Sequence, residues 1–169
     1  MWIYWILFLW PAIAALALDQ APSAIAKTNW LTWLFAILLT LVIGLRFEVG
    51  MDWDNYLVHL DMALDRTWLQ VLQGAEPAYY GANWLAARIG TGIWLVNLIS
   101  AVAFVSGLIA FSRRLPNPWL ALTIAMPYMA IVMAMNYTRQ GAAFGLVLWA
   151  LLSLHDGRMW RFVALLTSP

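Results

Sequence analysis

Long apolar runs alternate with short polar stretches through the whole chain. The runs that have the composition of membrane spans cover residues 2–18, 30–45, 89–111, 119–135 and 141–154, and a truncated run begins at residue 162. A helix needs about 20 predominantly apolar residues to cross a bilayer, and most of these runs come near that length. The pattern therefore predicts an all-α integral membrane protein, a multi-span bundle of transmembrane helices in a single domain over residues 1–169.

The last apolar run holds only the eight residues 162–169, too few to cross a bilayer. We therefore expect the sequence to be the N-terminal fragment of a longer protein. Within the other runs, Pro11 and Pro127 each predict a kink. Gly141 and Gly145 form a small-xxx-small pair, which is suited to close packing between membrane helices.

One polar segment, residues 46–88, is much longer than any other connection and is expected to lie outside the membrane. It carries six acidic residues against three arginines: Glu48, Asp52, Asp54, Asp61, Asp65 and Glu76 against Arg46, Arg66 and Arg88. We expect Asp52 or Asp54 to cap a helix that runs on to Leu72 and lies along the membrane interface. Asp54, Asp61 and Asp65 would share one face of that helix. Residues 76–81, which include a proline and a glycine, predict a turn.

The composition strengthens the membrane interpretation. The chain is 64% hydrophobic and only 10% charged, far from the balance of a soluble domain. Twelve tryptophans lie mostly near the ends of the apolar runs, where indoles anchor at the headgroup level. The net charge of +1 argues against nucleic acid as a partner, and the absence of cysteine excludes disulfides and thiolate metal sites within the sequence.

The positive charges predict an orientation in the membrane. One side of the bundle would hold five of them in short loops, at Lys27, Arg113, Arg114, Arg158 and Arg161. The other side would hold Arg46, Arg66, Arg88 and Arg139. Because positive charge in short loops favours the cytoplasmic side, the acidic segment and the N-terminus are expected on the extracytoplasmic side.

Two arginines are the first candidates for chemistry. Arg46 ends the second apolar run, and Asp52 and Asp54 follow within eight residues, with Gly50 allowing a tight fold between them. Arg139 lies between two apolar runs with almost no loop, where a charge is costly. Two guanidinium groups beside carboxylates would suit a lipid-linked phosphate or pyrophosphate. The alternative is that both arginines reach to the headgroups as helix-end cations.

The histidines and two tyrosines give weaker evidence for a functional site. His59 and His155 fall on opposite sides in this topology and cannot share a metal, and no nucleotide-binding or metal motif occurs, so no cofactor and no metal are expected. Tyr79 and Tyr80, next to Glu76, are candidates for stacking on a sugar; the alternative is aromatic anchoring at the interface.

Three patches of sequence resemble the EpsG family, which contains Wzy-like polysaccharide polymerases. The first patch is Gly44-Leu-Arg46-Phe-Glu-Val-Gly50-Met-Asp52-Trp-Asp54-Asn-Tyr56. The second is Glu76-Pro77-Ala-Tyr79, and the third is Asn136-Tyr-Thr-Arg139-Gln140-Gly-Ala-Ala143. The resemblance implies a multi-pass protein of the bacterial inner (plasma) membrane that takes part in exopolysaccharide or O-antigen assembly. Family members are about twice as long as this sequence.

The residues and the resemblance together give a mechanistic hypothesis for a glycosyltransferase acting on polyprenyl-pyrophosphate-linked repeat units. Arg46 and Arg139 would bind the donor pyrophosphate, and Asp52 or Asp54 would serve as the general base. The substrate-binding set would comprise Tyr56, Glu76, Tyr79, Tyr80 and Gln140. Membrane lipids and other polysaccharide assembly proteins are the remaining expected partners.

Two alternatives stay open. The same charges could line a path in a component that transports a lipid-linked sugar without reacting with it. The acidic segment could also be the docking surface of a non-catalytic subunit of a polysaccharide assembly complex.

Overall fold

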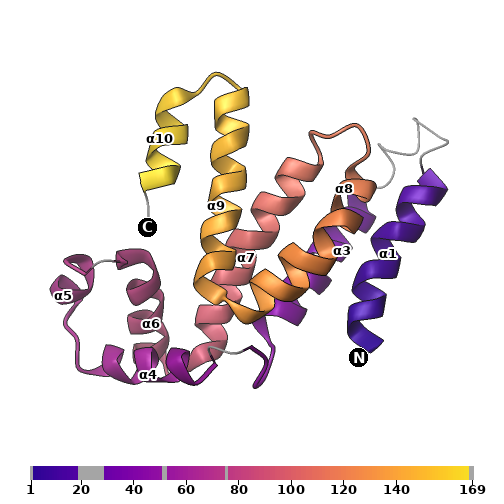
Figure 1. Cartoon of the computed structure of the whole chain (residues 1–169). Coiled ribbons are helices and arrows are strands. Elements are labelled where there is room, and N and C mark those ends of the chain that lie inside the picture. The colour runs from indigo at the N-terminus through magenta and orange to yellow at the C-terminus, as the bar shows by residue number, and fades with distance from the viewer. Residues whose placement is uncertain (1, 19–28, 51–52, 75, 168–169) are drawn as a thin grey trace.

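The computed structural model describes residues 2–18, 29–50, 53–74 and 76–167, and every regular element in these ranges is a helix (Figure 1). The all-α prediction is confirmed. The helices are α1 (Trp2–Leu18), α3 (Asn29–Gly44), α4 (Trp53–Leu64), α5 (Trp68–Leu72), α6 (Pro77–Ile89), α7 (Ile93–Ser112), α8 (Pro118–Ala125), the π-helix η1 (Met126–Ala134), α9 (Thr138–His155) and α10 (Met159–Thr167).

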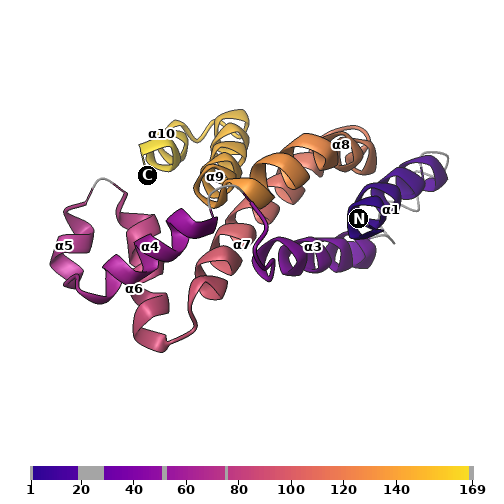
Figure 2. The ribbon, with the colours of Figure 1, turned by 60° about the horizontal axis from the view of Figure 1, so that its bottom comes forward.

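Helix α7 is the centre of the arrangement. It packs between α3 and α9, while α8 and η1 lie against α1, and α10 turns back along α9 (Figures 1 and 2). Helices α4, α5 and α6 form a group of their own beside the N-terminal ends of α7 and α9. The connections after α7 and α9 lie at the opposite end. We call these the α4–α6 end and the basic end, because the second holds Arg113, Arg114, Arg158 and Arg161.

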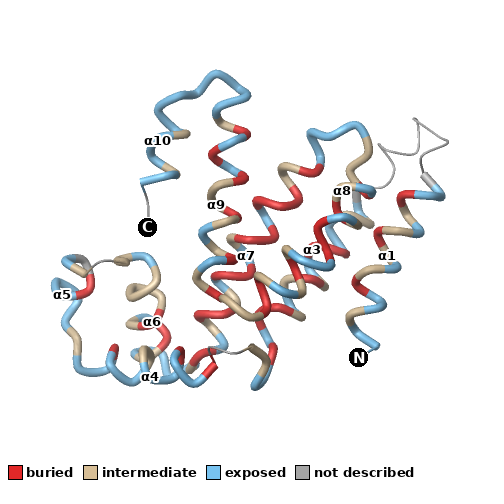
Figure 3. The backbone as a smooth tube through the Cα atoms, viewed as in Figure 1, coloured by how far each residue is buried: buried red, intermediate tan, exposed pale blue. Residues whose placement is uncertain are grey.

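The main core runs along the faces that α1, α3, α7, α8 and η1 turn toward one another, seen as the buried positions in Figure 3. Phe35 and Phe104 are fully buried there. Phe35 joins three helices, since its ring centroid lies 6.1 Å from that of Trp10 and 6.1 Å from that of Trp119. Large exposed side chains such as Trp2, at 85%, cover the outer faces. Apolar outer faces over a packed interior are expected for helices that contact lipid.

Helices α7 and α9 touch through their backbones. A Cβ added to Gly107 would lie 2.1 Å from the carbonyl oxygen of Gly145, and one added to Gly145 would lie 2.3 Å from that of Ala103. Gly141 meets η1 instead, with an added Cβ 3.0 Å from Cα of Ala134. The close packing predicted for Gly141 and Gly145 is present, and Gly145 packs against α7 whereas Gly141 packs against η1.

Pro127 coincides with a change in helix type. The α-helix ends at Ala125, and residues Met126–Ala134 continue as a π-helix. A proline has no N–H for the α-helical bond to the residue four positions earlier, and insertion of an extra residue per turn accommodates the missing bond. The sequence predicted a kink at Pro127, and the structure has a wider helix, the π-helix η1, at this position.

The segment between α3 and α7 differs from the prediction. A single helix ending at Leu72 was expected, but α4 ends at Leu64, and Thr67 starts the short helix α5, its N–H donating to Gln70 Oε1 over 2.9 Å. The turn predicted over residues 76–81 was wrong, because those residues begin helix α6. Proline is favoured at the first helical position, where its missing N–H costs nothing, and Pro77 takes that place.

The same correction moves the start of the third apolar helix. Helix α6 runs through Ile89 and ends at Gly90, which has a φ of 76° and closes the helix in the left-handed conformation. Helix α7 then begins at Ile93 rather than at residue 89. Among the described residues, α7 is the one helix long and apolar enough to cross a membrane, and Trp2–Ala17, Trp30–Gly44 and Pro118–Ala134 are shorter apolar helices.

Candidate functional site

An ion pair joins two of the three sequence patches. Arg139, in the first turn of α9, donates from Nη1 to Oε2 of Glu76 over 3.1 Å, and Glu76 precedes the first turn of α6. The two side chains keep 39% and 40% of their surface exposed. Glu76 is well placed at a helix N-terminus, whereas Arg139 faces the positive end of the α9 dipole. The carboxylate therefore offsets an unfavourable position for the arginine while leaving it accessible.

Aromatic rings surround this ion pair. The Arg139 guanidinium carbon lies 5.4 Å from the ring centroid of Tyr79, which lies 6.2 Å from that of Tyr56 and 5.9 Å from that of Tyr80. The His59 ring lies edge-on to two rings of α6, with centroids 6.0 Å from that of Tyr79 and 5.8 Å from that of Tyr80. The structure thus brings together the tyrosines predicted to bind sugar, and adds His59, which the sequence singled out only as a metal ligand to be rejected.

Two polar groups, the Tyr79 hydroxyl and the Asn83 amide, are buried next to the ion pair. Burial raises the pKa of Tyr79 to about 12, and its hydroxyl has no hydrogen-bond partner among the described residues. Asn83 is fully buried and donates to the carbonyl oxygen of Tyr79 over 2.9 Å. Burial, followed by the positive charge of Arg139, lowers the pKa of His59. The lowered pKa favours the neutral imidazole and the raised pKa favours the neutral phenol. The charges at this site therefore belong to Arg139, Glu76 and Arg66, whose guanidinium carbon lies 4.7 Å from the Tyr80 ring centroid.

An apolar cavity opens beside the ion pair. It has a volume of about 380 Å³ and lies between α6, α7 and α9. Its polar lining is Glu76, Tyr79, Ser100, Arg139 and Gln140, and its apolar lining is Ala78, Ala82, Ile99, Ala103, Ala142, Ala143 and Leu146. With a rise of 1.5 Å per residue, Leu146 lies roughly 10 Å along α9 from Arg139. The cavity therefore leads from a charged mouth along an apolar wall.

Arg46 is buried instead of facing this cavity. Only 6% of it is exposed, and its guanidinium donates to the carbonyl oxygens of Ile43 over 3.2 Å and Ala134 over 3.1 Å, and to Thr138 Oγ1. The Thr138 hydroxyl donates in turn to Asn97 Oδ1 over 3.2 Å. This network connects the end of α3 with α7, η1 and the start of α9. Arg46 thereby holds the residue next to Arg139 in place, and its role as a pyrophosphate ligand stays a prediction.

The loop after Arg46 reaches the same junction. Gly50 has a φ of 115°, and a Cβ there would lie 3.0 Å from the carbonyl oxygen of Met135. Phe47 stacks on Trp94 with ring centroids 5.9 Å apart and meets Trp53 edge-on at 5.9 Å. These contacts anchor the loop to the beginning of α7. The tight fold expected at Gly50 is present, and it packs the first patch against the third.

The structure describes only one of the two predicted general bases, Asp54. Asp52 lies outside the described residues. Asp54 is exposed in the first turn of α4, and no ion pair joins it to Arg46 or Arg139 in the part of the chain that the structure describes. In the same part, no three His, Asp or Glu side chains gather into a group that could hold a metal ion.

The residues that hold the site from within are not among those that the sequence predicts to be functional. Thr138 and Asn97 bond to each other across helices, and Asn83 lies under Tyr79. Asn97 is a strongly polar residue inside an apolar run of the sequence, and that is the available signal. A threonine beside an arginine at a helix start carries no comparable signal.

These features define an all-helical membrane-associated protein with a charged site at the mouth of an apolar cavity. A family model matches residues 29–167, and the chain belongs to the EpsG family. Membership makes it a membrane protein related to polysaccharide biosynthesis. No curated protein and no solved structure matches the chain.

Proposed function

We propose that this chain is part of a polymerase-type glycosyltransferase that extends a polysaccharide from polyprenyl-pyrophosphate-linked repeat units. The observation that supports it is Arg139 at the mouth of the apolar cavity. A lipid-linked sugar diphosphate combines an anionic head with an apolar tail. The half-exposed guanidinium suits the head, and the cavity wall along α9 suits the first isoprene units of the tail.

The proposal includes a placement in the membrane. The four shorter or less apolar helices α1, α3, α8 with η1, and α9 cross the bilayer beside α7, in the inner membrane of a bacterium. The basic end faces the cytoplasm, because positive charge in short loops favours that side. The α4–α6 end then lies on the extracytoplasmic surface, where α4 and α6 rest against the membrane interface.

In the proposed reaction, a hydroxyl oxygen of the acceptor sugar attacks the anomeric carbon of the donor. The bond from that carbon to the pyrophosphate oxygen breaks, and the leaving pyrophosphate takes the electron pair. Arg139, released from Glu76, stabilises the added negative charge. Asp52, or Asp54, accepts the proton of the hydroxyl. Tyr56, Tyr79 and Tyr80 carry the sugars, and Gln140 binds beside the diphosphate.

In this proposal Arg46 acts as a positioning residue. Its bonds to Ala134 and Thr138 hold the start of α9, which carries Arg139. The positive charge needed at the diphosphate comes from the protein, so the proposal requires neither a metal nor a cofactor. Activity that depends strictly on a divalent cation would contradict this part of it.

The test uses the complete gene and compares Arg139→Ala with Arg88→Ala. Arg88 is a matched control, because it is an exposed arginine at the same end that contacts the Trp84 ring at 5.4 Å and lies outside the cavity lining. Both variants are checked for insertion, and the surface polysaccharide is separated by length on a gel. We expect R139A to leave single repeat units and R88A to retain long polymer. Long polymer in R139A would refute the role of Arg139.

The same assay, extended to two aspartate variants, separates the two alternatives. If the protein were a transport component, R139A would leave the repeat units on the cytoplasmic side of the membrane instead of exporting them singly. If it were a non-catalytic docking subunit, Asp52→Asn and Asp54→Asn would both leave the polymer unchanged as long as the protein is inserted.

A further inference from the structure

A second cavity, with a polar lining, lies at the basic end, far from the site described above. It has a volume of about 610 Å³ and is formed by the C-terminal parts of α7 and α9 and by α10. Four arginines and one aspartate line it: Arg113, Arg114, Arg158, Arg161 and Asp156. None of these residues takes part in the proposed reaction.

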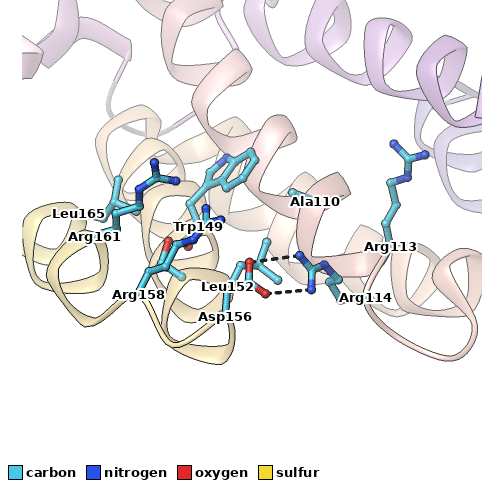
Figure 4. Close-up of a pocket in the computed structure, with 10 residues that line it drawn as sticks. Ala110, Arg113, Arg114, Trp149, Leu152, Asp156, Arg158, Arg161 and Leu165 are labelled. Atoms are coloured by element: carbon cyan, nitrogen blue, oxygen red, sulfur yellow. Dashed lines mark hydrogen bonds and ion pairs between the residues drawn. The ribbon is translucent and has the colours of Figure 1, made fainter.

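The charges have a definite arrangement (Figure 4). Arg114 is held by Asp156 through two bonds, Nη1 to Oδ1 over 3.0 Å and Nη2 to Oδ2 over 3.2 Å, and this pair ties the loop after α7 to the end of α9. Arg158 and Arg161 come from the other side, at the start of α10, and lie near Trp149. Because Asp156 is taken up by Arg114, the charges of Arg158 and Arg161 on the other side of the cavity suit an anion.

An apolar cavity continues from the basic one. It has a volume of about 410 Å³, lies between α3, α7 and α9, and shares Ala110, Arg113 and Trp149 with the basic cavity. Its other walls include Ile37, Val102 and Ile109. A small soluble anion would make no favourable contact with this apolar extension. A phospholipid would, because its phosphate would meet the arginines while one acyl chain lies along the apolar walls.

Helix α10 adds a further reason for a lipid. It has no buried residue, and its apolar side chains Trp160, Val163 and Leu166 are exposed by 79%, 52% and 48%. The arginines therefore precede an apolar surface, an order that matches the phosphate and the acyl chains of a phospholipid. Basic pockets between membrane helices on the cytoplasmic side bind the head groups of anionic lipids.

We propose that the basic cavity, together with its apolar extension, binds one anionic phospholipid of the surrounding membrane. Arg158 and Arg161 bind the phosphate, for which the planar guanidinium supplies paired donors. Arg114 stays with Asp156 and forms the opposite wall. The bound lipid would hold α10 against α9 at the basic end and leave the α4–α6 end free for the repeat units.

The experiment uses the full-length protein in nanodiscs of phosphatidylcholine with a minor fraction of phosphatidylglycerol, released into detergent and weighed by native mass spectrometry. The variant is Arg158→Gln with Arg161→Gln, and the matched control is Arg66→Gln with Arg88→Gln, which removes the same charge at the other end. Each arginine at an anionic surface contributes about fivefold, so we expect roughly thirtyfold weaker phosphatidylglycerol retention in the first variant and unchanged retention in the control.

Two further variants keep the test decisive. His155→Cys introduces a single thiol into the 169 residues, which contain no cysteine, and labelling with a membrane-impermeant maleimide reports the side on which the basic end lies. If the double glutamine variant changes orientation, Arg158→Lys with Arg161→Lys replaces it, since the charge remains while the paired donors are lost. We then expect a smaller but measurable loss of lipid.

Several results would overturn the proposal. Equal losses in the two charge-removing variants would show general attraction between the protein and the membrane. Equal retention of phosphatidylcholine and phosphatidylglycerol would show that the arginines do not select the lipid. Displacement of phosphatidylglycerol by millimolar inorganic phosphate would show a site for a soluble anion.

Discussion

Replacing Gly145 by alanine tests the backbone contact between α7 and α9. The added Cβ would lie 2.3 Å from the carbonyl oxygen of Ala103 and 2.5 Å from Cα of Phe104. Both are backbone atoms that cannot turn aside, so α7 and α9 must separate by roughly 1 Å to reach an ordinary contact distance. Overpacking of this kind costs about 1–3 kcal/mol. The better helix propensity of alanine returns at most about 1 kcal/mol, which leaves a net loss of stability.

Gly81 provides the matched control. It also lies inside a helix, but an added Cβ would meet only the Trp68 ring, at 3.8 Å. Gly81→Ala should therefore keep the propensity gain and stabilise the protein by up to about 1 kcal/mol. Thermal unfolding of the full-length protein in detergent, followed by tryptophan fluorescence, should place the apparent Tm of G145A below that of the wild type and that of G81A at or above it.

The contact also predicts non-additivity. Gly107→Ala should be at least as damaging as G145A, because its Cβ would lie 2.1 Å from the Gly145 carbonyl oxygen. Once one alanine has separated the helices, the second has less to displace, so the double variant should lose less stability than the sum of the two. The reasoning is refuted if G145A and G81A shift the Tm by the same amount in the same direction.

The remaining predictions concern the charged site. Because the pKa of Tyr79 is raised to about 12, the folded state holds its phenol proton more tightly than the unfolded chain does. The contribution of Tyr79 to stability is therefore complete below pH 10 and is lost as the pH rises from about 10 to 12. Tyrosinate absorbance should show one late-titrating group that disappears in Tyr79→Phe. Arg46→Lys keeps the charge, but the lysine cannot reach Ile43, Ala134 and Thr138 together. We expect the free energy of unfolding in detergent to fall by about 2–4 kcal/mol, and the inserted protein to make shorter polymer. Wild-type stability and polymer length in this variant would show that Arg46 is not a positioning residue. Glu76→Gln should free Arg139 and strengthen the retention of a lipid diphosphate added to the purified protein, and weaker retention would show that the carboxylate is needed to place the arginine.

The sequence alone determined the features that depend on local composition. Apolar runs separated by prolines, glycines and arginines predicted α1, α3 and α9 with bounds close to those observed, because a run of that length can satisfy its backbone only as a helix. The spacing of Gly141 and Gly145 predicted a close helix contact, and the three sequence patches led to the EpsG family, to which the chain belongs.

Only the tertiary structure decided which charges are used. Arg46 and Arg139 looked alike in sequence, each an arginine at the end of an apolar run. Arg46 is buried because its partners Ala134 and Thr138, 88 and 92 residues away, meet it at the junction of three helices. Arg139 stays accessible because its partner Glu76 stands at the start of another helix at the surface. Contacts across such distances depend on how helices assemble, and a local pattern does not contain them.

The structure also decided where the helices between α3 and α7 begin and end, since apolar residues four positions apart, Leu64, Trp68 and Leu72, continue through the break after Leu64. The same holds for Gly107, whose importance comes from the backbone of Gly145 that lies against it. In a chain this apolar, hydrophobicity predicts that helices form, and steric fit and hydrogen bonding between helices select the few polar and small residues on which the site depends.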